Sequence, residues 1–164
     1  MFGVSNTSPI SNLASIGRLH LLQAQFETVL IPVAVANELA AHPDPDAKAL
    51  IQSALGAGWI RICAVEDSPI LRMLHVQLHA GEAEAIALAL ESHADHVLID
   101  EKEGRRIALQ SGLSVTGVLG ILLASKEKAQ IAEIRPELDK LRALAGFFVA
   151  PALAAKVLAA AGET

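Results

Sequence analysis

Four polar residues occupy positions where side chains of their type bind divalent cations. Asn6 directly follows the first apolar segment, and Asp100 directly follows the apolar segment 97–99, while Glu38 and Glu82 lie on segments with helical spacing. Because the carboxyl ends of parallel strands open onto one edge of a sheet, we expect these side chains to converge there. Oxygen ligands of this kind suit Mg²⁺ or Mn²⁺, and such sites hydrolyse phosphodiesters by activating water.

The register of the two glutamates on their helices supports this interpretation. Glu38 continues the apolar stripe of Val35, and Glu82 continues that of Ile86, so each carboxylate is expected to be partly desolvated and to need a cation or a donor. Glu84 shares a more polar face and is expected in solvent. The alternative for either glutamate alone is an ordinary charge on a helix surface, or for Glu82 a carboxylate favoured by the helix dipole.

Short apolar runs alternate with longer amphipathic ones, which predicts βα units and a parallel sheet. The expected fold is a three-layer α/β/α domain spanning 1–164, with a central parallel sheet of four to five strands. Ser8 is expected to cap the first helix, which Gly17 ends, and Gly81 to separate two helices. The predicted strands are 2–5, 27–31, 59–65, 96–100 and 114–116. The predicted helices are 9–16, 32–41, 46–55, 68–79, 82–92, 104–111, 118–129, 136–144 and one that begins at 151.

Composition narrows the class of protein further. The chain has 164 residues, 52% of them hydrophobic and 3% aromatic, which favours helices packed on a buried sheet over an all-β sandwich. Its single cysteine, Cys63, excludes an internal disulfide and makes a cysteine zinc site implausible, so a reducing cytoplasm is expected. No signal peptide or membrane span is expected. The formal charge of −5 gives no global attraction for nucleic acid, so any such contact must be local or metal-assisted.

Three weaker signals have ordinary alternatives. His75 and His79 have the i, i+4 spacing of zinc ligands, but no third ligand is suitably spaced, which favours surface histidines. Thr116 precedes a helix whose free N–H groups would hold a phosphate, although the adjacent GxxG is equally typical of a turn. Arg105 and Arg106 follow the strand that ends at Asp100, and they either contact RNA backbone or form a solvated helix start.

Five segments in order resemble the PIN-domain superfamily, and most closely a PIN-like branch related to VapC-type toxins of toxin–antitoxin systems. The resemblance covers nearly the whole chain. The segments are Ser5-Asn-Thr-Ser-Pro-Ile10, Pro32-Val-Ala-Val-Ala-Asn-Glu38-Leu39, Gly81-Glu-Ala-Glu-Ala-Ile-Ala-Leu-Ala89, Leu98-Ile-Asp-Glu101 with Gly104-Arg-Arg106, and Val115-Thr-Gly117.

The resemblance implies a parallel sheet flanked by helices and an acidic pocket that binds Mg²⁺ or Mn²⁺ and cuts RNA. Asn6 stands where active PIN nucleases have Asp. Its amide oxygen is still able to coordinate a metal, but it lacks the negative charge of a carboxylate. The implied catalytic residues are Asn6, Glu38, Glu82 and Asp100, which are also metal ligands together with Glu101. The implied substrate contacts are Ser5, Thr7, Ser8, Thr116 and Arg105.

Two functions from different classes remain open. The first is a metal-dependent endoribonuclease, the toxin of a toxin–antitoxin pair, with RNA as substrate and a small antitoxin as partner. The second is a weak or inactive PIN scaffold that binds RNA or protein, which Asn6 and the negative charge favour. A nucleotide-binding α/β domain ranks behind both, because no Gly-rich loop follows the first strand. The apolar helix 151–161 carries one charge, Lys156, and predicts a homodimer.

Overall fold

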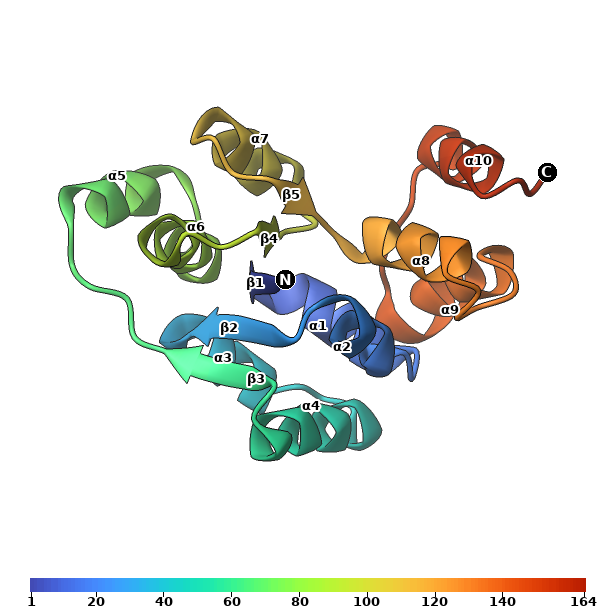
Figure 1. Cartoon of the computed structure of the whole chain (residues 1–164), viewed down its shortest axis with the longest axis horizontal. Helices are drawn as coiled ribbons and strands as arrows, with labels where there is room; N and C mark the ends of the chain where they lie inside the picture. Colours follow the sequence, from blue (N-terminus) through green and yellow to red (C-terminus); the bar gives the residue numbers. More distant parts are fainter.

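A five-stranded, all-parallel sheet organises the chain in the computed structural model, which describes residues 1–164. The strand order is β3-β2-β1-β4-β5, so the N-terminal strand lies at the centre (Figure 1). The predicted parallel α/β fold with four to five strands is confirmed. The strands are β1 (Phe2–Ser5), β2 (Thr28–Pro32), β3 (Ile60–Cys63), β4 (His96–Leu98) and β5 (Val115–Thr116).

Ten helices connect and follow the strands. Nine of them match the predicted helices to within a few residues, and α2 was not predicted. The helices are α1 (Thr7–Ser15), α2 (Leu19–Gln25), α3 (Val33–Ala40), α4 (Pro45–Ala57), α5 (Pro69–Gln77), α6 (Ala80–Ser92), α7 (Lys102–Gln110), α8 (Val118–Glu127), α9 (Arg135–Ala145) and α10 (Pro151–Ala160). None of them has the length and apolar character needed to cross a membrane.

The start of α1 differs from the prediction. Asn6, not Ser8, is the N-cap residue, and α1 begins at Thr7. Ser8 is instead the second residue of α1, and its hydroxyl donates to Asp100 Oδ2 at 2.9 Å. The side chain that was expected to cap α1 therefore connects this helix to the second residue after β4.

The prediction that Gly81 separates two helices is also wrong. His79 is the N-cap residue of α6, and Gly81 is the second residue of the helix. A Cβ atom at this position would lie 3.0 Å from Asn6 Oδ1 and 3.1 Å from Glu38 Oε1, closer than nearly all real Cβ contacts. The glycine therefore allows α6 to approach polar side chains of two other elements, and it does not break the helix.

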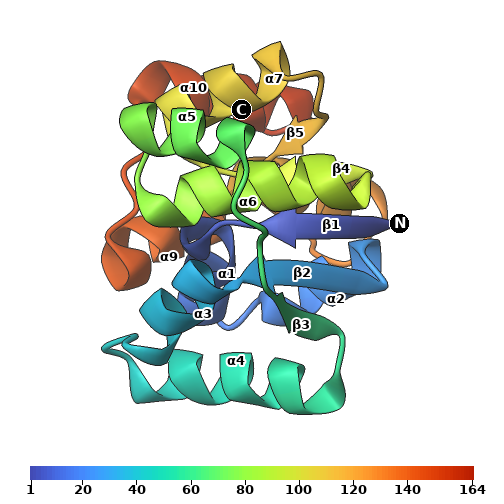
Figure 2. The same cartoon turned by 90° about the vertical axis from the view of Figure 1, so that its left-hand side faces the viewer.

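Two apolar cores cover the two faces of the sheet, as a three-layer fold requires. One face packs against α1, α2, α4, α8 and α9, with Ile10, Leu22 and Ile121 among its buried residues. The other face packs against α5, α6 and α7 through residues such as Ile86 and Ile107. Figures 1 and 2 show α5 and α6 stacked on the side of the sheet opposite α1 and α2.

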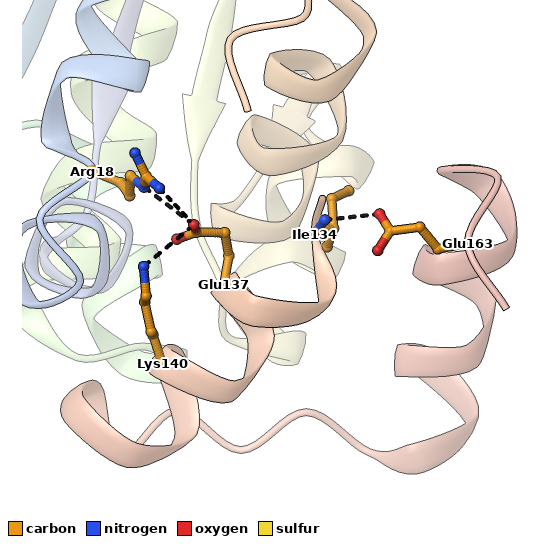
Figure 3. A network of polar contacts seen from close by, with 5 residues as sticks. All are labelled: Arg18, Ile134, Glu137, Lys140 and Glu163. Carbon is orange, nitrogen blue, oxygen red and sulfur yellow. Dashed lines mark hydrogen bonds and ion pairs between the residues drawn. The ribbon is translucent and has the colours of Figure 1, made fainter. Parts of the chain in front are cut away.

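Ion pairs fasten the C-terminal helices. The buried Glu137 of α9 accepts from Arg18 Nη2 at 2.8 Å and lies 3.6 Å from Lys140 Nζ (Figure 3). Glu163, after α10, accepts from the backbone N–H of Ile134 at 2.7 Å and from Lys126 Nζ at 2.8 Å. The end of the chain is thereby attached to the start of α9 and the end of α8.

Candidate active site

A fully polar cavity of about 470 Å³ opens at the carboxyl edge of the sheet, beside the starts of α1 and α6. No apolar residue and no Lys or Arg lines it. We call this cavity the acidic pocket. Its lining residues are Asn6, Thr7, Ser8, Ser11, Asn12, Glu38, His79, Gly81, Glu82 and Glu101.

Four separate elements bring the oxygen-bearing side chains to this pocket. Asn6 follows β1, where its backbone N–H donates to the Leu98 carbonyl oxygen of β4 at 3.0 Å. Glu101 comes three residues after β4, Glu38 lies on α3, and Glu82 lies in the first turn of α6. The pairing of β1 with β4 therefore places Asn6 and Glu101 side by side, as parallel topology predicts.

Direct contacts join these side chains. Asn6 Nδ2 donates to Glu101 Oε2 at 3.2 Å, and Thr7 Oγ1 donates to Glu38 Oε2. Asn6 Oδ1 and Glu38 Oε1 both approach the same point above Gly81. The amide nitrogen of Asn6 thus faces Glu101, and its amide oxygen lies on the side of Glu38.

Glu82 is the buried carboxylate of the pocket, at 7% exposed. Burial raises its pKa above the usual value, and the negative charges of Glu101 and Glu38 raise it further, while His79 acts in the opposite direction. Its Oε2 would lie only 2.6 Å from a Cβ at position 104, so Gly104 of α7 is also closely packed against the site. The predicted burial of Glu82 is confirmed, whereas Glu38 is exposed.

Asp100 does not line the acidic pocket, although the sequence placed it with the other ligands. Its Oδ2 accepts from Ser8 Oγ at 2.9 Å and from Asn12 Nδ2 at 3.3 Å, and its Oδ1 accepts from Val118 N at 2.8 Å. Burial raises the pKa of Asp100, and these three donors together with Arg105 partly offset the effect. The carboxylate of Asp100 links α1 to the start of α8, whereas Glu101, the other predicted ligand of this segment, lines the pocket.

The predicted substrate contacts fall into three groups. Thr7 and Ser8 line the acidic pocket. Ser5 is fully buried and donates to the Asn6 carbonyl oxygen, so it supports the backbone beneath the pocket. Thr116 and Arg105 line a different cavity of about 370 Å³, which we call the second cavity.

His79, Ser11 and Asn12 belong to the acidic pocket and were not predicted there. His79 precedes Glu82 by three residues, a spacing that places both in the first turn of one helix. Asn12 follows Ser8 by four residues on α1, and its side chain also donates to Ser8 Oγ at 3.0 Å. Ser11 likewise follows Thr7 by four residues on α1, so helical spacing from residues already selected would have found all three.

The donor chemistry of the pocket fits a hard divalent cation. No three His, Cys, Asp or Glu side chains are gathered closely enough to form a complete metal centre by themselves. However, Mg²⁺ keeps several waters and is usually bound through only one or two carboxylates. Asn6 Oδ1 and Glu38 Oε1 both approach one point above Gly81, Glu82 and Glu101 line the same cavity, and no Lys or Arg is present to pair with them.

Comparison with known families places this architecture. The family model described as DUF3368: PIN domain matches residues 2–163. The chain belongs to the PIN domain family. PIN domains are generally nucleases and typically use divalent metals, so this chain belongs to a nuclease-type superfamily. The acidic pocket lies at the sheet edge of this PIN domain, where the side chains of Asn6, Glu38, Glu82 and Glu101 meet.

A solved structure supports the fold independently. A PilT N-terminus domain protein from the hyperthermophilic archaeon Sulfolobus solfataricus P2 superposes on this PIN domain with a TM-score of 0.55. The two share 23% sequence identity over 76% of this chain and 93% of the archaeal chain. Among curated proteins, none matches the sequence.

Proposed function

We propose that this PIN domain is a metal-dependent ribonuclease that uses Mg²⁺ or Mn²⁺. The observation that carries the proposal is the acidic pocket itself, in which Asn6, Glu38, Glu82 and Glu101 come together from four elements without any Lys or Arg in the lining. Structural ion pairs place carboxylates beside Lys or Arg, as Glu137 does beside Arg18. Three carboxylates around one cavity that no Lys or Arg lines instead favour a metal cation as their partner.

The same four side chains would hold the metal, and a bound metal supplies an activated water and stabilises the leaving oxygen of the phosphodiester. Thr7 fixes the orientation of Glu38 by donating to one of its carboxylate oxygens. Ser8 and Asn12 are held by Asp100, and they present polar groups along the wall of the pocket. Asp100 acts as a positioning residue, because its own oxygens are directed at these donors and at α8.

RNA is the proposed substrate, and the proposed biological setting is the toxin half of a toxin–antitoxin pair. The cavity has negative side chains and no cation of its own, so a basic segment of a small antitoxin protein would complement and cover it. The resemblance of nearly the whole chain to a PIN-like branch related to VapC-type toxins supports this setting.

A cleavage assay together with calorimetry tests the ribonuclease proposal. We expect cleavage of a mixed RNA pool that needs Mn²⁺ or Mg²⁺ and stops with EDTA. Glu101→Gln and Glu38→Gln are expected to weaken Mn²⁺ binding at least tenfold in calorimetric titration and to reduce cleavage in parallel. The matched control is Glu91→Gln, which removes an exposed carboxylate of α6 outside the pocket. Metal-independent cleavage, or cleavage unchanged in both pocket variants, would contradict the proposal.

A non-cleaving scaffold is the second candidate, and one contact favours it. Asn6 donates its amide N–H to Glu101, so in the metal-free protein it satisfies a carboxylate oxygen that a cation would otherwise take. A scaffold would show no cleavage and no calorimetric Mn²⁺ binding below the millimolar range. In that case Asn6→Asp would still leave the protein inactive.

A further inference from the structure

The second cavity differs in character from the acidic pocket. It lies between the end of β5, the start of α8 and the side of α10, and half of its lining residues are apolar. Figure 1 shows α10 beside α8, on the C-terminal side of β5. The apolar wall comes from Val115, Leu119, Phe147, Leu153 and Val157, and the polar part from Asp100, Arg105, Thr116, Gly117 and Gly120.

Arg105 is the unusual polar residue of this cavity. It is half-buried, and its Nη1 donates to the Ile99 carbonyl oxygen at 2.8 Å, which fixes the guanidinium in place. It takes part in no ion pair, whereas the next residue, Arg106, is paired with Glu103. The remaining N–H groups of Arg105 therefore have no acceptor in the protein, and a planar ligand edge with two adjacent acceptors would match them.

Asp100 stands between the two cavities. Its carboxylate lines the second cavity, while it accepts hydrogen bonds from Ser8 and Asn12, which line the acidic pocket. Asp100, Ser8 and Asn12 thus separate the two cavities. An RNA strand bound at the acidic pocket would reach the second cavity with an adjacent nucleotide. The five apolar residues and the Asp100 carboxylate beside Arg105 favour a nucleobase over a phosphate group in the second cavity.

We propose that the second cavity binds one nucleobase of the RNA, with guanine preferred. The inference rests on the proposed ribonuclease function and identifies which part of the substrate lies beside the reacting phosphate. Guanine offers the adjacent acceptors O6 and N7 to Arg105 and an N–H donor to Asp100 Oδ1, which accepts only one hydrogen bond within the protein, from Val118. Its faces would pack on Phe147 and the side chains of α10. The cavity volume of about 370 Å³ lies within the range of small-molecule sites, roughly 300–1,000 Å³.

Binding of mononucleotides to the full-length chain tests the inference without any need for activity. The probes are the four ribonucleoside 5′-monophosphates and ribose 5-phosphate, followed by amide chemical shifts in solution. We expect shifts at Thr116, Gly117 and Phe147, largest with guanosine monophosphate and absent with ribose 5-phosphate. Equal shifts with ribose 5-phosphate, or no response to any nucleotide at these amides, would overturn the inference, and a larger response to another base would overturn the preference for guanine.

Two adjacent arginines provide a matched pair of variants. Arg105→Gln is expected to weaken the guanosine monophosphate response at least fivefold, whereas Arg106→Gln, outside the cavity, is expected to leave it unchanged. Leu153→Trp, at a 45% exposed position on the cavity wall, is expected to block the same response without disturbing the core. Thermal unfolding confirms that each variant is folded. An equal response in Arg105→Gln and Arg106→Gln would overturn the assignment.

The cleavage assay separates this inference from the proposed function. Metal-dependent cleavage without nucleobase binding would overturn only the inference about the second cavity. Nucleobase binding that depends on Arg105, in a protein that cuts no RNA, would support that inference and overturn the ribonuclease proposal.

Discussion

The side-chain amide of Asn6 donates a hydrogen bond to Glu101 Oε2 at 3.2 Å, across the ends of two adjacent parallel strands. An aspartate at position 6 would have no N–H to donate, and it would face Glu101 as a second negative charge. The metal-free pocket is therefore more stable with Asn6 than it would be with Asp, whereas the metal-bound pocket would gain from the extra charge. Asn6 shifts the balance between these two states.

Replacing Asn6 by Asp should change the stability of the metal-free and the metal-bound protein in opposite directions. In EDTA, Asn6→Asp is expected to lower the free energy of unfolding by about 1 kcal/mol, or roughly 2–4 °C in the melting temperature, because a hydrogen bond is replaced by repulsion. With saturating Mn²⁺ the variant should gain more stability than the parent chain. The control is Asn37→Asp at an exposed position of α3. A smaller Mn²⁺ gain in the variant would show that residue 6 is not a metal ligand.

The raised pKa of Glu82 predicts a pH dependence of stability in the metal-free protein. A carboxylate whose pKa is higher in the folded state stabilises the fold while it is protonated, so stability is lost as the pH rises from about 4.5 through the raised pKa. Glu82→Gln is expected to remove this loss and to raise the melting temperature near pH 7 by a few degrees. Melting curves from pH 4 to 8 in EDTA, with Glu91→Gln as control, provide the measurement. Parallel curves for Glu82→Gln and the parent chain would contradict the prediction.

Asp100 and Glu101 are neighbours in sequence but should respond differently to the loss of charge. Asp100→Asn disturbs the donors Ser8, Asn12 and Val118, so we expect a loss of about 1–3 kcal/mol in unfolding free energy. Glu101→Gln is expected to keep the stability and to weaken Mn²⁺ binding. Denaturant unfolding and calorimetry on both variants distinguish the two roles. The assignment fails if Asp100→Asn is as stable as the parent chain but loses Mn²⁺ binding.

Glu163 predicts a separate loss of stability at low pH. Lys126 and the backbone N–H groups of Ile134 and Arg135 lower the pKa of Glu163 to about 2. A carboxylate with a lowered pKa stabilises the fold above its unfolded pKa, so this contribution is lost as the pH falls from about 4.5 to 2. At neutral pH, Glu163→Gln is expected to lower stability by about 1 kcal/mol, and the exposed Glu133→Gln should have no effect. Equal losses in the two variants would be inconsistent with this role.

Exposed apolar residues on α5 predict association of the chain with itself. Ile70, Met73 and Val76 recur at intervals of three residues on the outer face, and Val76 is 86% exposed. We expect light scattering at micromolar concentration to give roughly twice the 17.2 kDa mass of one chain. Met73→Glu should shift the mass toward that of a monomer. A monomeric parent chain would contradict the prediction, and a dimer that survives Met73→Glu but not Leu153→Glu would move the interface to α10.

The sequence predicted those parts of the fold that depend on local pattern. Five strands and nine helices follow from the alternation of apolar runs, but α2 has only seven residues, fewer than two helical turns, and its periodicity was too short to detect. The grouping of Asn6 with Glu38 and Glu82 was also accessible, because strand ends and helix registers position them. The position of Asp100 outside the acidic pocket was not accessible. It depends on donors from Ser8, Asn12 and Val118, which are distant in sequence and approach only in the folded chain.

The close packing of glycines against carboxylates limits how this protein can be made more stable by engineering. Replacing a glycine inside a helix by alanine usually gains about 1 kcal/mol, and a design procedure based on helix propensity would select Gly81 and Gly104. At these positions the added methyl group would press on Asn6 Oδ1 or Glu82 Oε2, so a choice that improves the helix would distort the acidic pocket. Gly56, inside α4, has no atom within 4 Å of the place that an added methyl group would occupy, and it offers the same gain without that penalty.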